Sequence, residues 1–176
     1  MTGNWLVFVK TKPGVQLHKI VVAPDYRALG LTAFSHWKPL NPEEPDGIRR
    51  DDLIWFFLSG SGIEKLCRVS DNCVRGRPHP AAPEHALSLQ YPVEVIASFS
   101  PIRAKEFART YHDLRSGGGN VPVDEDGRFR MNVYCHSLPD PVARELARLA
   151  DSKPSKRQVR PPSSSVIDCL NMRSDR

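Results

Sequence analysis

The chain has 176 residues, 40% hydrophobic and 26% charged, which is typical of one globular domain with a proper core. No apolar run approaches the roughly 18 residues of a membrane span, and the start lacks the basic lead of a signal peptide, so we expect a cytoplasmic protein without membrane contact. The net charge of +5 favours a polyanionic partner, although residues 151–176 hold six basic and three acidic side chains and the body is nearly balanced.

The four cysteines, Cys67, Cys73, Cys135 and Cys169, are scattered without a CxxC pair. In a chain without a secretory signal, this spacing indicates free thiols rather than disulfides or a zinc site. We therefore expect no metal and no cofactor, with Cys67 and Cys135 as buried, unpaired thiols on strands.

The first part of the chain predicts short strands separated by loops. Residues 5–10, "WLVFVK", form a β-type run that ends before the turn signal Pro13-Gly14. Residues 17–22, "LHKIVV", fit either a second strand or a short helix. The segment 38–47, "KPLNPEEPDG", is a loop, because its closely spaced prolines remove the backbone donors that a strand needs.

Residues 51–69, "DDLIWFFLSGSGIEKLCRV", give the clearest pattern in the chain. Six apolar residues, Leu53 to Leu58, precede a Ser-Gly-Ser-Gly turn and a mixed return run, which predicts a β-hairpin with a buried first strand. Trp55 within that strand allows two interpretations, a core residue or the wall of a pocket for a flat ligand, and the core interpretation is the more common one.

The following segments alternate between loop and strand. Residues 75–85, "RGRPHPAAPEH", predict a loop with three prolines. "YPVEVIASF" predicts a strand with Val93, Val95 and Ala97 on one face and with Glu94 and Ser98 on the other.

Two helices and one strand are expected next. The first helix has Ser100 as its N-cap and Pro101 in its first turn, and the second has Asp140 as its cap. Their apolar stripes are Ala104, Phe107, Ala108 and Tyr111, and Val142, Leu146, Leu149 and Ala150. Between the helices, residues 129–135, "FRMNVYC", predict a strand.

From Lys153 onward the chain is rich in Pro, Ser and basic residues, so we expect a folded domain over 1–152 and a disordered basic tail over 153–176. The order of elements predicts an α+β fold, a small curved β-barrel or sheet with peripheral helices.

Four phrases, taken in order, resemble the EVE domain, a member of the PUA-like superfold and a sibling of the YTH domain. They are "NWLVFVKTKPG", "AFSHWKP", "DDLIWFFLSGSGIEKLCRV" and "GGGNVPVDEDGRFRMNVYCHSLPDPVARELARLAD". Both families bind nucleic acid that carries a modified base, flipped into a pocket. The resemblance therefore implies a non-enzymatic reader of a modified base in DNA or RNA. YTH domains carry a second cage tryptophan after the hairpin, and "RGRPHPAAPEHALSLQ" has none.

A flipped base needs aromatic faces to replace its lost stacking, small polar groups to read its edge and cations to hold the flanking phosphates. The candidates are Phe34 and Trp37 for stacking, Trp55 for a wall, Thr11, Ser35 and Ser59 for edge contacts, and Lys10, Lys12, Arg75 and Arg77 for phosphates. Ordinary structural interpretations exist for several of them. Thr11 and Ser59 fit turn caps, Lys10 and Lys12 a solvated edge, and Arg75 and Arg77 a flexible, solvent-facing loop.

Two other classes of function stay open at this point. An enzyme, for example an ASCH-like ribonuclease, needs a cluster of Lys, His or Glu facing one cleft; "HPAAPEH" brings His79, Glu84 and His85 together, but a Pro-rich loop frames catalysis poorly. The sequence contains no GxSxG, HExxH, phosphate-loop or dinucleotide motif, so no catalytic residue is predicted. A protein-interaction or inhibitor module would instead show an exposed apolar patch.

Overall fold

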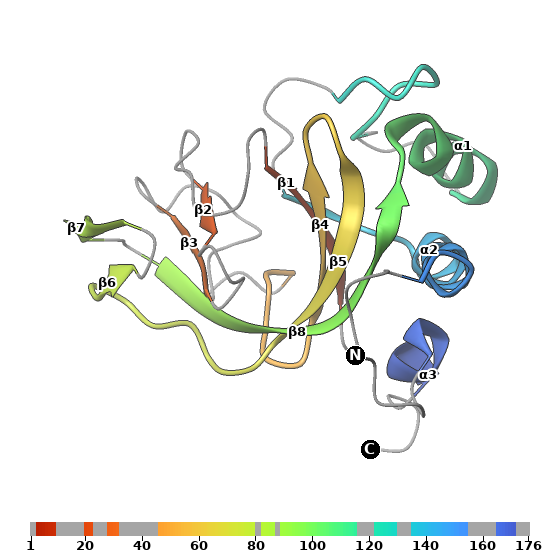
Figure 1. Cartoon of the computed structure of the whole chain (residues 1–176). Helices are drawn as coiled ribbons and strands as arrows, with labels where there is room; N and C mark the ends of the chain where they lie inside the picture. Colours follow the sequence, from red (N-terminus) through yellow and green to blue (C-terminus); the bar gives the residue numbers. More distant parts are fainter. Residues whose placement is uncertain are drawn as a thin grey trace.

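A computed structural model of the chain shows a mixed α+β fold, with a seven-stranded sheet, a separate pair of short strands and helices on one side (Figure 1). The α+β class predicted from the order of elements is therefore confirmed. The structure describes residues 3–9, 20–22, 28–31, 46–79, 82–86, 89–115, 122–129, 135–154 and 165–171.

The centre of the sheet consists of β1 (Asn4–Val9), β4 (Leu53–Leu58), β5 (Gly62–Val69) and β8 (Leu89–Ile102). The strand order is β2-β3-β8-β5-β4-β1-β9, and β1 pairs with β4 in parallel while the other neighbours run antiparallel. Every residue of β4 is buried, because the sheet is covered on both faces at this strand. The hairpin predicted from the six-residue apolar run is confirmed.

Shorter strands extend the sheet at both ends. β2 (Ile20–Val22) and β3 (Ala28–Leu31) continue it beyond β8, so the strand alternative is confirmed for residues 20–22, and residues 17–19 lie outside the described part of the chain. β9 (Cys135–Ser137) pairs with β1 at the opposite edge. Of the strand predicted over 129–135, residues 130–134 lie outside the described part of the chain.

A separate two-stranded pair corrects one loop prediction. β6 (Pro78–His79) and β7 (Ala82–Ala86) pair with each other inside the Pro-rich segment 75–85. Proline is tolerated at a strand end such as Pro78, where the missing N–H is not needed for the ladder. The prolines of this segment therefore limit the length of the strands without preventing them.

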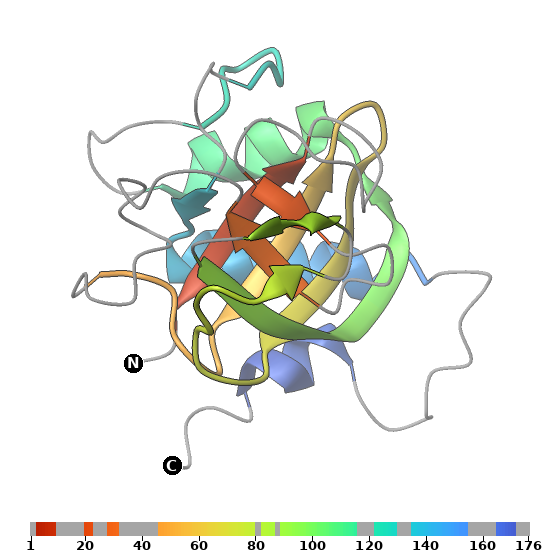
Figure 2. The same ribbon diagram turned by 90° about the vertical axis from the view of Figure 1, so that its left-hand side faces the viewer.

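The two faces of the sheet bury two separate apolar clusters. Alternation along β1 sends Leu6 toward the helices, where it packs with residues such as Phe107 and Leu146, and sends Trp5 and Val7 to the opposite face. Figure 2, seen from the end that carries β6 and β7, shows the helices behind the central strands. The sheet therefore has one face covered by the helices and an opposite face with its own apolar cluster. β8 contributes residues to that second cluster as well.

The side chains of β8 that point to the helical face at one end of the strand are out of register with those at the other end. Val93 packs in the cluster opposite the helices and Val95 contacts that cluster, whereas Ala97 belongs to the helical cluster. The pairing with β5 shifts register between Leu66 and Cys67, which lie opposite Ala97 and Val95. The prediction of one common face for Val93, Val95 and Ala97 is wrong, because a bulge reorients the strand between them. β8 bends visibly in Figure 1.

The helix α1 (Ala104–Leu114) begins later than predicted. Ser100 and Pro101 are still part of β8, and Arg103 is the N-cap, without a side-chain cap bond. Pairing with β5 extends as far as Ile102, and it overrides the local capping signal. The predicted apolar stripe is confirmed, since Phe107, Ala108 and Tyr111 are buried.

The helix α2 (Asp140–Asp151) lies where it was predicted. Pro139 is its N-cap and Asp140 its first residue, so the cap lies one residue earlier than expected, within the usual uncertainty of helix ends. Val142, Leu146 and Ala150 are buried against the sheet.

The predicted disordered tail is wrong for residues 165–171. Val166 begins a short helix, α3 (Val166–Asn171), and its side chain is fully buried in the helical cluster. The carboxylate of Asp151 accepts hydrogen bonds from the backbone N–H groups of Val166 (2.7 Å) and Ile167 (3.1 Å). This helix therefore packs on the domain instead of extending from it.

The start of the predicted tail is also ordered. The N–H of Ser100 donates to the carbonyl of Lys153 at 2.8 Å, and Phe99 forms a β-bridge with Pro154. Lys153 also forms an ion pair with Glu106 of α1 at 2.5 Å. The domain therefore includes Lys153 and Pro154 as well as α3. Within the described residues, no helix is long and apolar enough to cross a membrane.

Candidate functional site

The parallel strands β1 and β4 end side by side. Val9 lies opposite Leu58, and the backbone N–H of Ser59 donates to the carbonyl of Val9 at 2.9 Å. Because parallel strands have their carboxyl ends at the same edge, the chain leaves Val9 next to Ser59. Three predicted site residues, Lys10, Thr11 and Lys12, are the next in sequence and lie outside the described residues. We call Val9, Leu58 and Ser59 the β1–β4 edge.

The hydroxyl group of Ser59 is available at this edge. Ser59 is exposed, and its side chain makes no hydrogen bond to the described part of the chain. The turn itself is closed by other groups, since the N–H of Ser61 donates to the carbonyl of Leu58 at 3.0 Å and the Ser61 hydroxyl contacts Glu64 at 3.1 Å. The turn-cap interpretation of Ser59 therefore has no support from these contacts.

A cluster of aromatic rings lies directly behind the β1–β4 edge. Phe8 precedes Val9, and its ring stacks on Phe129 with centroids 4.5 Å apart and on Phe57 at 5.4 Å. Phe57 and Phe107 are buried, whereas Phe8 and Phe129 are half-buried. Sequence reasoning missed Phe8 and Phe129. Strand alternation puts Phe8 on the face of Leu6, but Phe129 is far away in sequence and gives no such signal.

Phe129 is held in place by a tight hairpin. Val123 and Phe129 form a β-bridge, the N–H of Gly127 donates to the carbonyl of Asp124 at 3.0 Å, and the carboxylate of Asp124 accepts the N–H of Arg128 at 2.8 Å. Gly127 has φ +83°, and a Cβ there would lie 2.9 Å from the backbone of Ala104. Glycine is therefore required both for the turn and for its contact with α1. The sequence "DEDG" carries this turn signal, which the sequence analysis did not use.

A tyrosine–histidine pair joins the same cluster to the sheet edge. The hydroxyl of Tyr111 lies 2.9 Å from Nε2 of His136, and the Tyr111 ring centroid is 5.8 Å from that of Phe107. Burial lowers the pKa of His136 and raises the pKa of Tyr111, so both groups are neutral at pH 7. No described residue holds the other ring nitrogen of His136, as the third group of a catalytic arrangement would. The observed effect of the pair is to join α1 to β9.

Trp55 is a core residue and not the wall of an open pocket. Its side chain is 0% exposed, it belongs to the helical cluster, and its ring centroid lies 6.2 Å from that of Phe99. A wall needs an accessible ring face, so the pocket interpretation of Trp55 is wrong. Its indole N–H has no acceptor among the described residues.

Arg75 and Arg77 lie away from the β1–β4 edge. Both are exposed, and they follow the end of β5, whereas Ser59 precedes its start. Their backbone is anchored on both sides: Val74 and Gln90 exchange two backbone hydrogen bonds of 2.8 and 2.9 Å, and the buried side chain of Gln90 donates to the carbonyl of Arg77. The structure thus separates these two arginines from Ser59.

The remaining predicted site residues, Phe34, Ser35 and Trp37, lie outside the described part of the chain, as do the side chains of His79, Glu84 and His85. The structure therefore gives no geometry for stacking by Trp37 or for a histidine pair. Among the predicted pocket residues that the structure describes, Ser59 lies at the surface.

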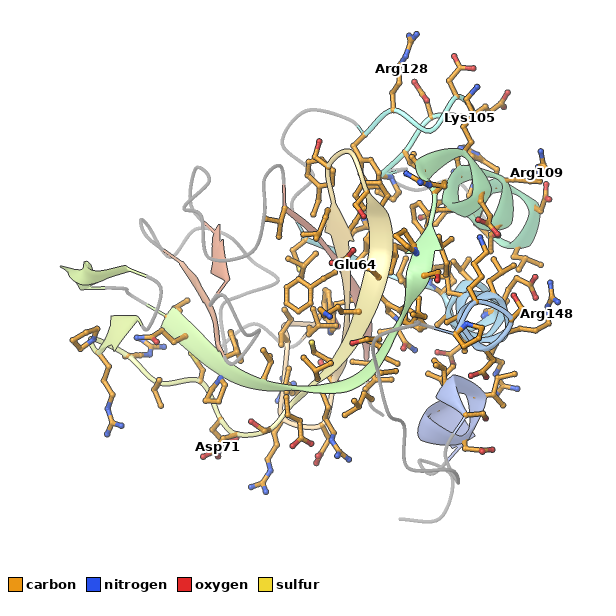
Figure 3. All side chains as sticks on the ribbon, viewed as in Figure 1. Glu64, Asp71, Lys105, Arg109, Arg128 and Arg148 are labelled. Atoms are coloured by element: carbon orange, nitrogen blue, oxygen red, sulfur yellow. The ribbon has the colours of Figure 1, made fainter. Side chains whose placement is uncertain are left out.

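The helical face is electrically balanced. Over residues 103–115, 122–129, 135–154 and 165–171, eight basic and nine acidic side chains nearly cancel. Figure 3 shows Lys105, Arg109, Arg128 and Arg148 on this side of the molecule, and Arg148 pairs with Glu145 at 2.5 Å. The net charge of +5 therefore comes from the rest of the chain, and the helical face is a poor surface for a polyanion.

The described cysteines are free thiols. Cys67 is buried on β5, while Cys73 and Cys135 are half-buried, so the prediction of unpaired thiols is confirmed for these three, and Cys135 is less buried than expected. Burial raises the pKa of all three thiols, which keeps them protonated and unreactive at neutral pH. Within the described residues, no group of three His, Cys, Asp or Glu side chains could hold a metal ion.

Comparison with models of known protein families and with curated proteins found no match for this chain. The candidate site therefore rests on the geometry of the β1–β4 edge and on the sequence around it.

Proposed function

We propose that this protein is a non-enzymatic nucleic-acid-binding module that holds a modified base, flipped out of its strand, at the β1–β4 edge. The observation that supports the proposal is the hydrogen bond from the N–H of Ser59 to the carbonyl of Val9. It brings the exposed Ser59 hydroxyl next to the point where Lys10, Thr11 and Lys12 begin. Polar edge-reading groups and phosphate-binding cations are thereby expected at one edge.

The roles of these residues follow from the chemistry of a flipped base. Ser59 and Thr11, together with Ser35, offer small hydroxyl groups that can donate to or accept from the edge of a base. Lys10 and Lys12 are cations for the flanking phosphates, which fix the position of the strand and carry no sequence information. Trp37 and Phe34 supply the stacking faces in this proposal.

The ring pair of Phe8 and Phe129 adds to the proposal. Base–aromatic contacts contribute roughly 1 to 3 kcal/mol per stacked base, and they need a ring that is fixed and partly accessible. Phe8 is half-buried and precedes Val9 directly, and Phe129 is held against it at 4.5 Å. These rings form an apolar surface immediately behind the polar groups of the edge. No observation among the described residues gives comparable support to the enzyme alternative or to the interaction-module alternative.

The proposal is tested by comparing the affinities of the protein for modified and unmodified oligonucleotides in three variants. Trp37→Ala should reduce the preference for the modified strand by roughly 1 to 3 kcal/mol, because it removes a stacking face. Ser59→Ala should reduce the same preference by about 1 kcal/mol, the usual contribution of one hydrogen bond. Lys10→Ala should weaken binding to both strands alike, because phosphates are common to them.

Circular dichroism on each variant provides the control for folding. If Trp37→Ala and Ser59→Ala leave the ratio of the two affinities at the wild-type value in folded protein, the base does not bind at this edge.

A further inference from the structure

The turn Arg75-Gly76-Arg77 is an exposed arginine turn on a fixed backbone. Val74 is joined to Gln90 by two backbone hydrogen bonds, and Gln90, only 4% exposed, donates its side-chain amide to the carbonyl of Arg77. Gly76 has φ +64°, a left-handed conformation that bends the chain between these two attachments. A buried glutamine is thus used to hold the backbone of a surface arginine.

The arginine turn lies far from the β1–β4 edge along the sheet. The two are separated by the full length of β5, which has 8 residues and at about 3.3 Å per residue spans roughly 26 Å. A stacked nucleic-acid strand advances about 3.4 Å per nucleotide, so this length corresponds to roughly eight nucleotides. A ligand confined to a flipped base and its two phosphates would not reach the turn.

We propose that the arginine turn is a second phosphate-binding element, which holds the backbone of the same nucleic acid several nucleotides away from the flipped base. This inference rests on the proposed function. It implies that the protein contacts several nucleotides of one strand, so that the ligand is a polynucleotide and not a free nucleotide. Arginine suits this role because its guanidinium group donates to phosphate oxygens in a fixed fork.

The charges elsewhere on the molecule are consistent with a nucleic-acid strand that runs from the β1–β4 edge to the arginine turn. The neighbouring Arg68 on β5 is already paired with Glu94 at 2.6 Å, and the helical face is balanced. Arg77 is exposed and forms no ion pair with a described residue. Arg77 is therefore a surface cation with an anchored backbone and with no ion-pair partner within the described chain.

The experiment measures the affinity of the full chain for single-stranded oligo-dT, as a trinucleotide and as an oligonucleotide of about sixteen residues, over a series of salt concentrations. The wild type should bind the long strand with a steeper salt dependence. Arg77→Ala should lower the magnitude of that slope by about 0.7, the value for one lost contact on a single strand, and should leave trinucleotide binding unchanged. Arg109→Ala, which removes an equal charge from the outer face of α1 (Figure 3), is the matched control and should leave both unchanged.

Gln90→Met tests the fixed backbone separately, because methionine keeps the size of the side chain and loses the amide donor. It should weaken binding of the long strand without changing trinucleotide binding. Equal effects of Arg77→Ala and Arg109→Ala, or salt slopes that are the same for both lengths, would overturn the second element.

Those outcomes would leave the proposed function in place if the wild type still prefers the modified base. Conversely, length-dependent binding that requires Arg77, without any preference for a modified base, would contradict the proposed function and support the arginine turn. Complete absence of binding to both lengths of oligo-dT would overturn the second element, and the proposed function would then be judged by the comparison of modified with unmodified oligonucleotides.

Discussion

Trp5 and Trp55 lie on neighbouring strands and face opposite sides of the sheet. The indole N–H of Trp5 donates to the carboxylate of Asp52 at 2.8 Å, and the same buried carboxylate also accepts the backbone N–H of Arg49 at 2.9 Å. The indole N–H of Trp55 has no acceptor among the described residues. An unpaired buried donor costs about 1 to 3 kcal/mol, so the two rings contribute differently to stability despite their equal size.

Replacing each tryptophan with phenylalanine should separate these contributions. Both changes remove a similar volume from the core, so the cavity costs are comparable. Trp5→Phe also removes a hydrogen bond to a charged group, whereas Trp55→Phe removes an unsatisfied donor. We expect Trp5→Phe to lower the free energy of unfolding by about 2 kcal/mol more than Trp55→Phe, as measured by urea denaturation. A larger loss for Trp55→Phe would show that its N–H is satisfied in solution.

For a single residue, the sequence predicts whether the side chain is buried better than it predicts which hydrogen-bond partners surround its polar atoms. The apolar run Leu53 to Leu58 predicts a buried strand, and Trp55 is buried. The run has no polar alternation, so it does not indicate which face Trp55 takes. That choice, and the absence of an acceptor, depend on side chains from β8 and the helices.

Among the elements, the C-terminal helix α3 shows how a short capping signal can outweigh composition. The hydroxyl of Ser165 accepts the N–H of Asp168 at 3.0 Å, and the carboxylate of Asp168 accepts the N–H of Ser165 at 3.1 Å. This reciprocal pair is a capping box of the form S-x-x-D, and it begins the helix whose apolar residues Ile167 and Leu170 pack on the domain. A composition-based prediction of disorder averages over such a signal.

Removing residues 165–176 should destabilise the domain. The deletion exposes the surface under Val166, whose burial contributes about 1.5 to 3 kcal/mol, and leaves the Asp151 carboxylate without its two N–H donors. We expect a loss of about 1 to 3 kcal/mol in chemical denaturation. Removing only residues 172–176 is the matched control and should have no effect. If both truncations unfold at the wild-type denaturant concentration, α3 does not contribute to the stability of the domain.

The pairing of elements was harder to predict than the elements themselves. The strands β1, β4 and β5 and the helices α1 and α2 follow from local patterns of apolar residues. The parallel pairing of β1 with β4 joins segments that are far apart in sequence, and no local pattern specifies it. Ser59 and the start of the Lys10–Lys12 segment meet only through that pairing, and Arg75 and Arg77 are separated from them by the length of β5.

On the scale of the whole molecule, both faces of the sheet bury apolar clusters, and the candidate site lies at the ends of two of its strands. The helices cover one face (Figure 1), and at the β1–β4 edge the N–H of Ser59 donates to the carbonyl of Val9, which directly precedes Lys10 in the sequence. Under the proposed function, a polyanion binds at this edge and not on the helical face. We propose that the arginine turn holds the same polyanion farther along the sheet.

The most direct test of the central claim is the affinity of the wild-type protein for a panel of DNA and RNA oligonucleotides, each offered with and without a base modification. We expect at least one modified oligonucleotide to bind more tightly than its unmodified counterpart, by about 5-fold to 150-fold if one stacked base supplies roughly 1 to 3 kcal/mol of the difference. Equal affinities for every modified and unmodified pair would contradict a base-reading site at the β1–β4 edge.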